Sequence, residues 1–240
     1  MDKITELVQE YFKTPIAESG QYYPEALCLY EKNGERVARP VSEEQPLGAN
    51  ATVQLTDRLS DEIQYAHVAY EKDGATMQEI LAYMHIRAGW KLIAVLRAWC
   101  DSPFENLFED PLAEAKEFQS IGEVLGTYLD GVYLLDAEKA LEMFADGARM
   151  RHPLDEETFA DVPCTVFRER WANQENSKQQ GIPRFTRIYH IELLNASTAV
   201  AKVGVAKLND HFYDYLYCLK LNGQWKIVHK ITQMLWRREA

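Results

Sequence analysis

The sequence predicts an α+β protein in which helices pack on an antiparallel sheet, and it predicts that this unit occurs twice. Ile121, Leu125, Tyr128 and Val132 recur at helical spacing, so they form one apolar helix face. Later segments alternate apolar and polar residues, as half-buried strands do. Asn-Gly pairs between these segments indicate tight hairpin turns. Helices followed by a meander of strands are typical of an α+β domain.

The first 100 residues contain one predicted helix and several predicted strands. Residues 3–12 carry apolar side chains on one helical face. A hairpin is expected around Asn33-Gly34, and the polar stretch 41–50, with Pro46 and Gly48, predicts a loop. Three further strands are expected at about 61–72, 76–87 and 90–99.

The second half shows the same order of elements with longer helices. After helix 121–136, a second helix should begin at the N-cap Asp136 and end near Gly147. A third is expected over about 161–180, with Pro163 in its first turn. Four strands should follow, which are RFTRIYHIELL, TAVAKVGVAKL, HFYDYLYCLKL and QWKIVHKITQMLW.

An internal repeat relates the two halves. When Trp90 is placed on Trp225, the offset of 135 holds without a gap from about Glu62 to Trp99. The opening helices align at an offset of 117, so the first copy is the shorter one. The interpretation is a shortened, degenerate domain at 1–100, an acidic, proline-marked linker at 101–119 and a complete domain at 120–240.

Composition excludes several classes of function. The net charge of -11 would repel both a nucleic acid backbone and an anionic membrane. The chain has no apolar run long enough to span a bilayer and no secretory signal, so a cytoplasmic protein is expected. Its 4 cysteines stand far apart without a C-x-x-C pair, which predicts buried thiols and no metal site. No cofactor is indicated.

Tyrosines are concentrated in the third predicted strand of the second domain. Strand alternation places Tyr213, Tyr215 and Tyr217 on one face and Asp214 on the other. Such a row suits a subunit interface or packed core, and it also suits the wall of a ligand cavity. If the following two-residue turn sets the register, His229 lies on the Asp214 side, where a structural role is the simpler interpretation.

The stretch YLDGVYLLDAEKALEMFADGARMRHP, followed by a meander ending in LNGQWKIVHK, resembles the nuclear transport factor 2-like superfamily. The resemblance implies a cystatin-like cone, in which helices cover a curved sheet and leave a pocket. The superfamily includes ketosteroid isomerase, scytalone dehydratase, polyketide cyclases of the SnoaL type and a group labelled "putative lumazine-binding", to which the DYLYCLKLNGQWKI ending is most similar. Two such cones in one chain would form an intrachain pseudo-dimer; the sequence leaves open whether two chains also form a homodimer.

The resemblance to ketosteroid isomerase also implies site residues. Tyr128 aligns with that enzyme's oxyanion-binding tyrosine, His152 with its general-base aspartate, and Tyr217 with its second oxyanion donor. A histidine could abstract a proton next to a carbonyl, and two tyrosine hydroxyls could stabilise the enolate. The simpler interpretation is that Tyr128 is a core residue and His152 is exposed at the end of a strand.

The sequence therefore predicts a small-molecule-binding protein with a pocket in the C-terminal domain. His152, Tyr128 and Tyr217 are the candidate catalytic residues, and Trp171, His190 and Tyr215 are the candidate ligand-binding residues. Chemistry of the isomerase, dehydratase or cyclase type is one hypothesis. The alternative is a non-enzymatic binding or assembly module that uses the tyrosine row as a protein interface.

Overall fold

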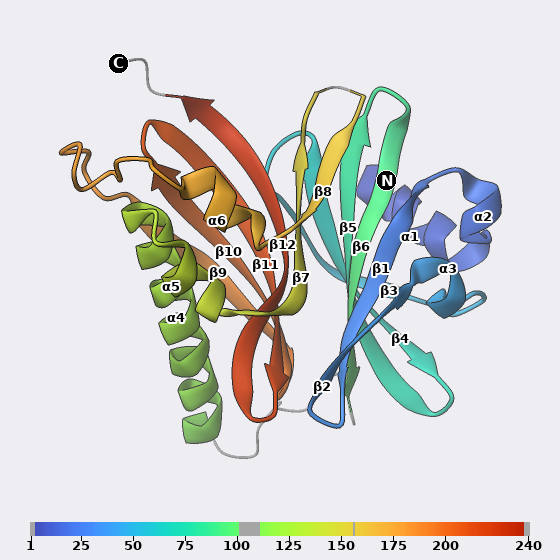
Figure 1. Ribbon diagram of the computed structural model, residues 1–240. Coiled ribbons are helices and arrows are strands. Elements are labelled where there is room, and N and C mark those ends of the chain that lie inside the picture. The colour runs from blue at the N-terminus through green and yellow to red at the C-terminus, as the bar shows by residue number, and fades with distance from the viewer. Residues whose placement is uncertain (1–2, 101–110, 156, 238–240) are drawn as a thin grey trace. The chain divides into compact units, whose positions relative to one another are not determined.

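The computed structural model describes residues 3–100, 111–155 and 157–237 (Figure 1). The chain forms two compact units. The N-terminal unit comprises Met1–Leu107 with Asp155–Thr158, and the C-terminal unit comprises Phe108–Leu154 with Phe159–Ala240. Each contains a six-stranded sheet and helices, which confirms the predicted α+β class.

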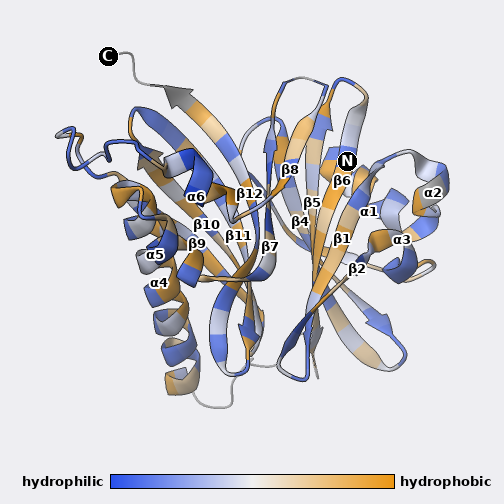
Figure 2. Cartoon of the chain, in the orientation of Figure 1, coloured by the Kyte–Doolittle hydropathy of each residue, from blue (hydrophilic) through white to orange (hydrophobic). Residues whose placement is uncertain are grey.

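The N-terminal unit places a short layer of helices on its sheet. The helices are α1 (Lys3–Lys13), α2 (Ile16–Ser19) and α3 (Val41–Glu44). The strands are β1 (Tyr22–Lys32), β2 (Glu35–Pro40), β3 (Thr52–Arg58), β4 (Ile63–Lys72), β5 (Ala75–Ile86) and β6 (Gly89–Cys100). Their order is β2-β1-β6-β5-β4-β3, and only β1 and β6 pair in parallel. The buried residues of α1 join the core with apolar residues of β4, β5 and β6. Figure 2 shows that β6 is largely hydrophobic.

The C-terminal unit has the same plan with a long first helix. Its helices are α4 (Pro111–Leu134), α5 (Ala137–Glu142) and α6 (Val166–Trp171). Its strands are β7 (Phe144–Pro153), β8 (Phe159–Pro163), β9 (Thr186–Asn195), β10 (Thr198–Lys207), β11 (Asp210–Leu221) and β12 (Gln224–Arg237). They are ordered β8-β7-β12-β11-β10-β9, and β7 pairs with β12 in parallel. α4 lies against β9, β10 and β12.

The two sheets agree in detail with the internal repeat. Strands β10, β11 and β12 each begin 135 residues after β4, β5 and β6. Each last strand also carries a bulge of one residue at the same place, Ile93 in β6 and Val228 in β12. A bulge shifts the side-chain alternation by one residue, so it decides which side chains of the last strand face the helices.

Several predicted boundaries are wrong. The predicted linker 101–119 is helical from Pro111 onward, while 101–110 lie outside the described residues. The helix that begins at Asp136 ends at Glu142, and Gly147 lies within β7 at φ +69 rather than capping a helix. The N-cap itself is confirmed, because the Asp136 carboxylate accepts the Lys139 backbone N–H at 3.0 Å.

The remaining differences concern short elements. Only residues 166–171 of the predicted helix 161–180 are helical, because Pro163 ends β8, which pairs with β7. Strands β3 and β8 were not predicted, since neither shows strong apolar alternation. A short helix, α3, lies within the predicted loop 41–50.

The packing of α4 on α5 depends on Gly131. A Cβ at this position would lie 2.7 Å from the Ala140 backbone nitrogen and 2.9 Å from its Cα. Backbone atoms cannot move aside as the end of a flexible side chain can, so only glycine permits this approach. Gly126, on the same helix, has nothing within 4 Å of the equivalent point.

We expect Gly131→Ala to lower the unfolding free energy by about 1–3 kcal/mol, because the added methyl overpacks the contact with Ala140. Gly126→Ala is the matched control and should be neutral or stabilising by up to about 1 kcal/mol, because alanine favours the helix. Chemical denaturation of both variants measures the difference. Equal effects would show that the approach to Ala140 is not a constraint.

Candidate functional site

A buried polar cluster connects α4 to the sheet of the C-terminal unit. The Tyr128 hydroxyl donates to Asp214 Oδ2 at 2.8 Å, and Lys230 Nζ donates to the same hydroxyl at 2.8 Å. Lys230 also forms an ion pair with Asp214, and the Thr232 hydroxyl donates to the other carboxylate oxygen. These four side chains are at most 6% exposed. Each polar group of the cluster therefore has a protein partner.

The cluster does not leave Tyr128 available to stabilise an oxyanion. A phenol has one proton to donate, and Asp214 accepts it. Burial, and then the negative charge of Asp214, raise the pKa of Tyr128 well above its ordinary value, so the hydroxyl stays protonated. The cluster therefore holds the helix on the sheet. Its hydrogen-bond donors are already used within the protein, so Tyr128 offers none to a ligand.

The bulge at Val228 explains why sequence reasoning missed Asp214 and Lys230 as partners. Before the bulge, Cys218 is opposite Ile227; after it, Tyr217 is opposite His229 and Leu216 is opposite Lys230. Directly opposite residues share a sheet face. Lys230 therefore lies on the Asp214 face, and the prediction that His229 does so is wrong. A charged residue in the middle of each of the two strands was the available signal.

His152 lies on the same sheet face as this cluster. Met150, two residues before it, is opposite Lys230 in the β7–β12 ladder. His152 Nδ1 is 3.0 Å from the Pro153 carbonyl oxygen, while Nε2 is buried with no hydrogen-bond partner among the described residues. Burial lowers the pKa of His152, and the charges of Arg170 and Lys230 lower it further, despite the opposing Pro153 contact. The ring is therefore held neutral and is able to accept a proton.

Trp171 is connected to Tyr128 by a chain of aromatic rings. It stacks on Phe167 with centroids 4.6 Å apart and planes at 4°. Phe167 meets Phe144 edge-on at 5.9 Å, and Phe144 meets Tyr128 at 5.5 Å. Such pairs fix the orientation of each ring. Trp171 therefore lies in the packed aromatic core beside the cluster.

The other predicted residues lie elsewhere. Tyr215 and Tyr217 alternate with Asp214 along β11, which places them on the opposite face of the sheet from Tyr128. The Tyr217 hydroxyl is buried without a hydrogen-bond partner among the described residues, and burial raises the pKa of that group. The His190 side chain is 46% exposed, with Nε2 3.7 Å from Glu192. The structure therefore does not bring the predicted set together at one point.

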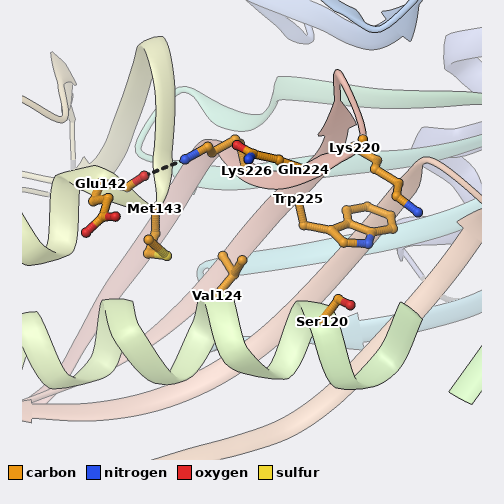
Figure 3. A pocket seen from close by; sticks show the side chains of 9 residues that line it. Ser120, Val124, Glu142, Met143, Lys220, Gln224, Trp225 and Lys226 are labelled. Carbon is orange, nitrogen blue, oxygen red and sulfur yellow. Dashed lines mark hydrogen bonds between the residues drawn. The ribbon is translucent and has the colours of Figure 1, made fainter. Parts of the chain in front are cut away.

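A groove with a volume of about 360 Å³ lies elsewhere on the C-terminal unit, between α4, the end of α5 and the β11–β12 hairpin (Figure 3). Its lining residues are Ser120, Val124, Glu142, Met143, Lys220, Gly223, Gln224, Trp225 and Lys226. Lys226 Nζ donates to the Glu142 carbonyl at 2.7 Å, across the groove from α4. No local sequence pattern indicates this groove, because its shape depends on how the hairpin meets two helices.

Glu117 fixes the orientation of the groove's tryptophan. Its carboxylate accepts the Trp225 indole N–H at 2.7 Å and also binds the Lys220 ammonium group. Partial burial acts to raise the pKa of Glu117, but the bonds from Lys220 and Trp225 outweigh burial and hold that pKa below its usual value. The carboxylate therefore stays charged. Glu117 belongs to the stretch predicted as a solvated linker. The structure instead places it in α4, where its carboxylate binds Lys220 and Trp225.

Among the residues that the structure describes, no group of three or more His, Cys, Asp or Glu side chains could hold a metal ion. No helix in the described ranges has the length and apolar character required to cross a membrane. All four cysteines are buried thiols.

Comparison with known protein families gives one match, over residues 116–233, to the family described as "Putative lumazine-binding". The C-terminal half of this chain resembles that family. The resemblance predicted from LNGQWKIVHK and the helices before it is thereby confirmed for this half of the chain. The match includes the Tyr128 cluster and every residue that lines the groove. Comparison with curated proteins finds no match.

Solved structures similar to this chain include an NTF2-like protein of unknown function from Shewanella baltica, at 22% identity and TM-score 0.45, covering 51% of this chain and 96% of that one. An NTF2-like protein of unknown function from Methylobacillus flagellatus has 24% identity and TM-score 0.42, covering 50% and 94%. A ketosteroid isomerase-like protein from Erwinia carotovora atroseptica has 13% identity and TM-score 0.40, covering 50% and 98%.

We expect Lys230→Met to lower the unfolding free energy by about 3–5 kcal/mol, because it leaves the Asp214 charge buried without its counterion. Adding Asp214→Asn should recover part of this loss, since the uncompensated charge is then removed. Lys178→Met, at an exposed position, is the control and should change stability by less than about 0.5 kcal/mol. Additive losses in a double-mutant cycle would contradict direct coupling.

Proposed function

We propose that the C-terminal unit binds a small, flat organic molecule in the groove beside Trp225. The observation that carries this proposal is the groove itself, whose volume of about 360 Å³ falls within the range of small-molecule sites, roughly 300–1,000 Å³. The family match supports it, because the matched segment contains the whole lining and the family's description names lumazine, a flat bicyclic heterocycle.

The lining suggests which chemistry such a ligand has. Trp225, Val124 and Met143 supply apolar surface, and the Glu117 carboxylate holds the indole in a fixed orientation. A fixed aromatic ring favours stacking of another flat ring. Lys220 and Lys226 add positive charge at the groove. The preferred ligand is therefore a planar heterocycle that carries carbonyl oxygens or an acidic group.

A substitution that fills the groove tests the site. Lumazine is the probe, and binding is measured by calorimetry. We expect Ser120→Trp to weaken binding at least tenfold, because Ser120 lines the groove and is exposed on α4. Gln119→Trp, on the neighbouring exposed position outside the lining, is the matched control and should bind as the wild type does. Equal affinities for both variants, with binding still present, would place the ligand elsewhere.

A second candidate function is proton transfer by His152, in a reaction of the isomerase, dehydratase or cyclase type. The observation that favours it is the buried Nε2 without a partner among the described residues, on a ring whose pKa is lowered. A general base must be neutral to accept a proton. Such a reaction would proceed without Tyr128 as the oxyanion donor, because its proton is held by Asp214. The tyrosine row of β11 as a protein interface stays a prediction.

Because the pKa of His152 is lowered, the folded protein binds a proton there less readily than the unfolded chain does. We expect the ring resonances of His152 in NMR to titrate below the ordinary value of about 6.5. Keeping the His152 ring neutral in the folded protein therefore costs no stability above that value, and the protein loses stability as the pH falls from that value toward the folded pKa.

His152→Ala should abolish turnover of any carbonyl substrate found by screening, whereas Tyr128→Phe should not. Turnover that survives His152→Ala would exclude the base assignment.

A further inference from the structure

Two tyrosines of the N-terminal unit, Tyr11 and Tyr83, have buried hydroxyl groups. Tyr11 of α1 is 5% exposed and Tyr83 of β5 is 1% exposed. Neither hydroxyl has a hydrogen-bond partner among the described residues. A buried hydroxyl that makes no hydrogen bond is costly, so native proteins normally supply a partner from the chain or from a bound molecule.

The same two side chains line one small void. Its volume is about 10 Å³, about the space that one water molecule requires. The remaining lining comes from α1, α2, the residues after α2, and β6, namely Leu7, Glu10, Ile16, Ser19, Gln21 and Leu92. The two tyrosines and the void thus belong to one location between the helices and the sheet.

Comparison with the C-terminal unit shows how the surroundings of Tyr11 differ from those of its counterpart, Tyr128. Tyr128, which aligns with Tyr11 in the repeat, donates its proton to Asp214. The equivalent acid in the N-terminal unit is Glu79, at the same offset of 135. One oxygen of Glu79 already accepts the Tyr70 hydroxyl at 2.8 Å and the Arg97 Nε at 2.6 Å. Tyr70 therefore takes the role that Tyr128 has in the other unit. The second oxygen of Glu79 is also buried without a hydrogen-bond partner among the described residues, so it does not bind the Tyr11 hydroxyl directly.

We propose that the N-terminal unit has a binding site of its own for one neutral, oxygen-containing ligand of water size, held between Tyr11 and Tyr83. The two phenols donate to the lone pairs of the ligand oxygen, which is the geometry that a water molecule accepts. An anion is disfavoured because Glu79 lies on the same strand face as Tyr83 and Glu10 lines the void. The resident ligand is accordingly an internal water molecule. This site is independent of the groove in the C-terminal unit.

Single hydroxyl deletions test whether the site is occupied. If a bound water accepts both protons, Tyr11→Phe and Tyr83→Phe should each lower the Tm of the full chain by about 2–4 °C, as the loss of a buried hydrogen bond does. Tyr70→Phe is the positive control, because its hydroxyl has a known acceptor in Glu79. If the void were empty, removing an unpartnered hydroxyl would leave the Tm unchanged or raise it, and that result would overturn the proposal.

A direct measurement distinguishes a bound water from a change in packing. We expect water–protein NOEs in NMR from a long-lived water to the methyl groups of Leu7 and Leu92, which line the void. These cross-peaks should be lost in the Tyr11→Phe/Tyr83→Phe double variant and kept in Tyr70→Phe. Absence of the cross-peaks in the wild type, or their persistence in the double variant, would contradict a site formed by these two hydroxyls.

Discussion

A buried carboxylate paired with a buried cation is the interaction on which both units depend. Asp214 pairs with Lys230 in the C-terminal unit, and Glu79 pairs with Arg97 in the N-terminal unit. The acids stand at equivalent positions of the repeat, 135 residues apart, and both are 0% exposed. A charge without a partner at this depth would be strongly destabilising, so each acid constrains the side chains around it.

The two units satisfy this constraint in different ways, and the difference determines what each can bind. In the C-terminal unit the hydroxyl that completes the pair comes from α4, so the acid fastens the helix to the sheet. In the N-terminal unit it comes from Tyr70 within the sheet, and Arg97 extends to Glu44 of α3. Tyr11, the helix tyrosine of the first copy, therefore does not bind the buried acid. In the C-terminal unit the helix tyrosine is bound to the acid, whereas in the N-terminal unit the hydroxyls of Tyr11 and Tyr83 have no hydrogen-bond partner among the described residues.

The groove that could hold a larger ligand is therefore not at Tyr128, where the resemblance to ketosteroid isomerase implied a pocket. The interior around Tyr128 is filled by ion pairing and stacked aromatic rings. The open volume lies instead by the β11–β12 hairpin, where Glu117 of α4 orients Trp225. Of the predicted catalytic residues, His152 is the one whose buried ring nitrogen supports the proposed proton transfer. The two proposed functions therefore involve different parts of the unit.

The sequence by itself determined the α+β class, the duplication and most strands, because hydrophobic periodicity and Asn-Gly turns are local signals. A core position was also the simpler interpretation of Tyr128, whereas Trp171 was predicted to bind a ligand and instead packs among aromatic rings. Only the tertiary structure decided the partner of Tyr128. A single bulge at Val228 reverses the alternation of β12 and directs Lys230, rather than His229, toward Asp214. The groove likewise needed tertiary structure, because its walls come from a helix start and a hairpin about 100 residues apart, and no local pattern records their approach.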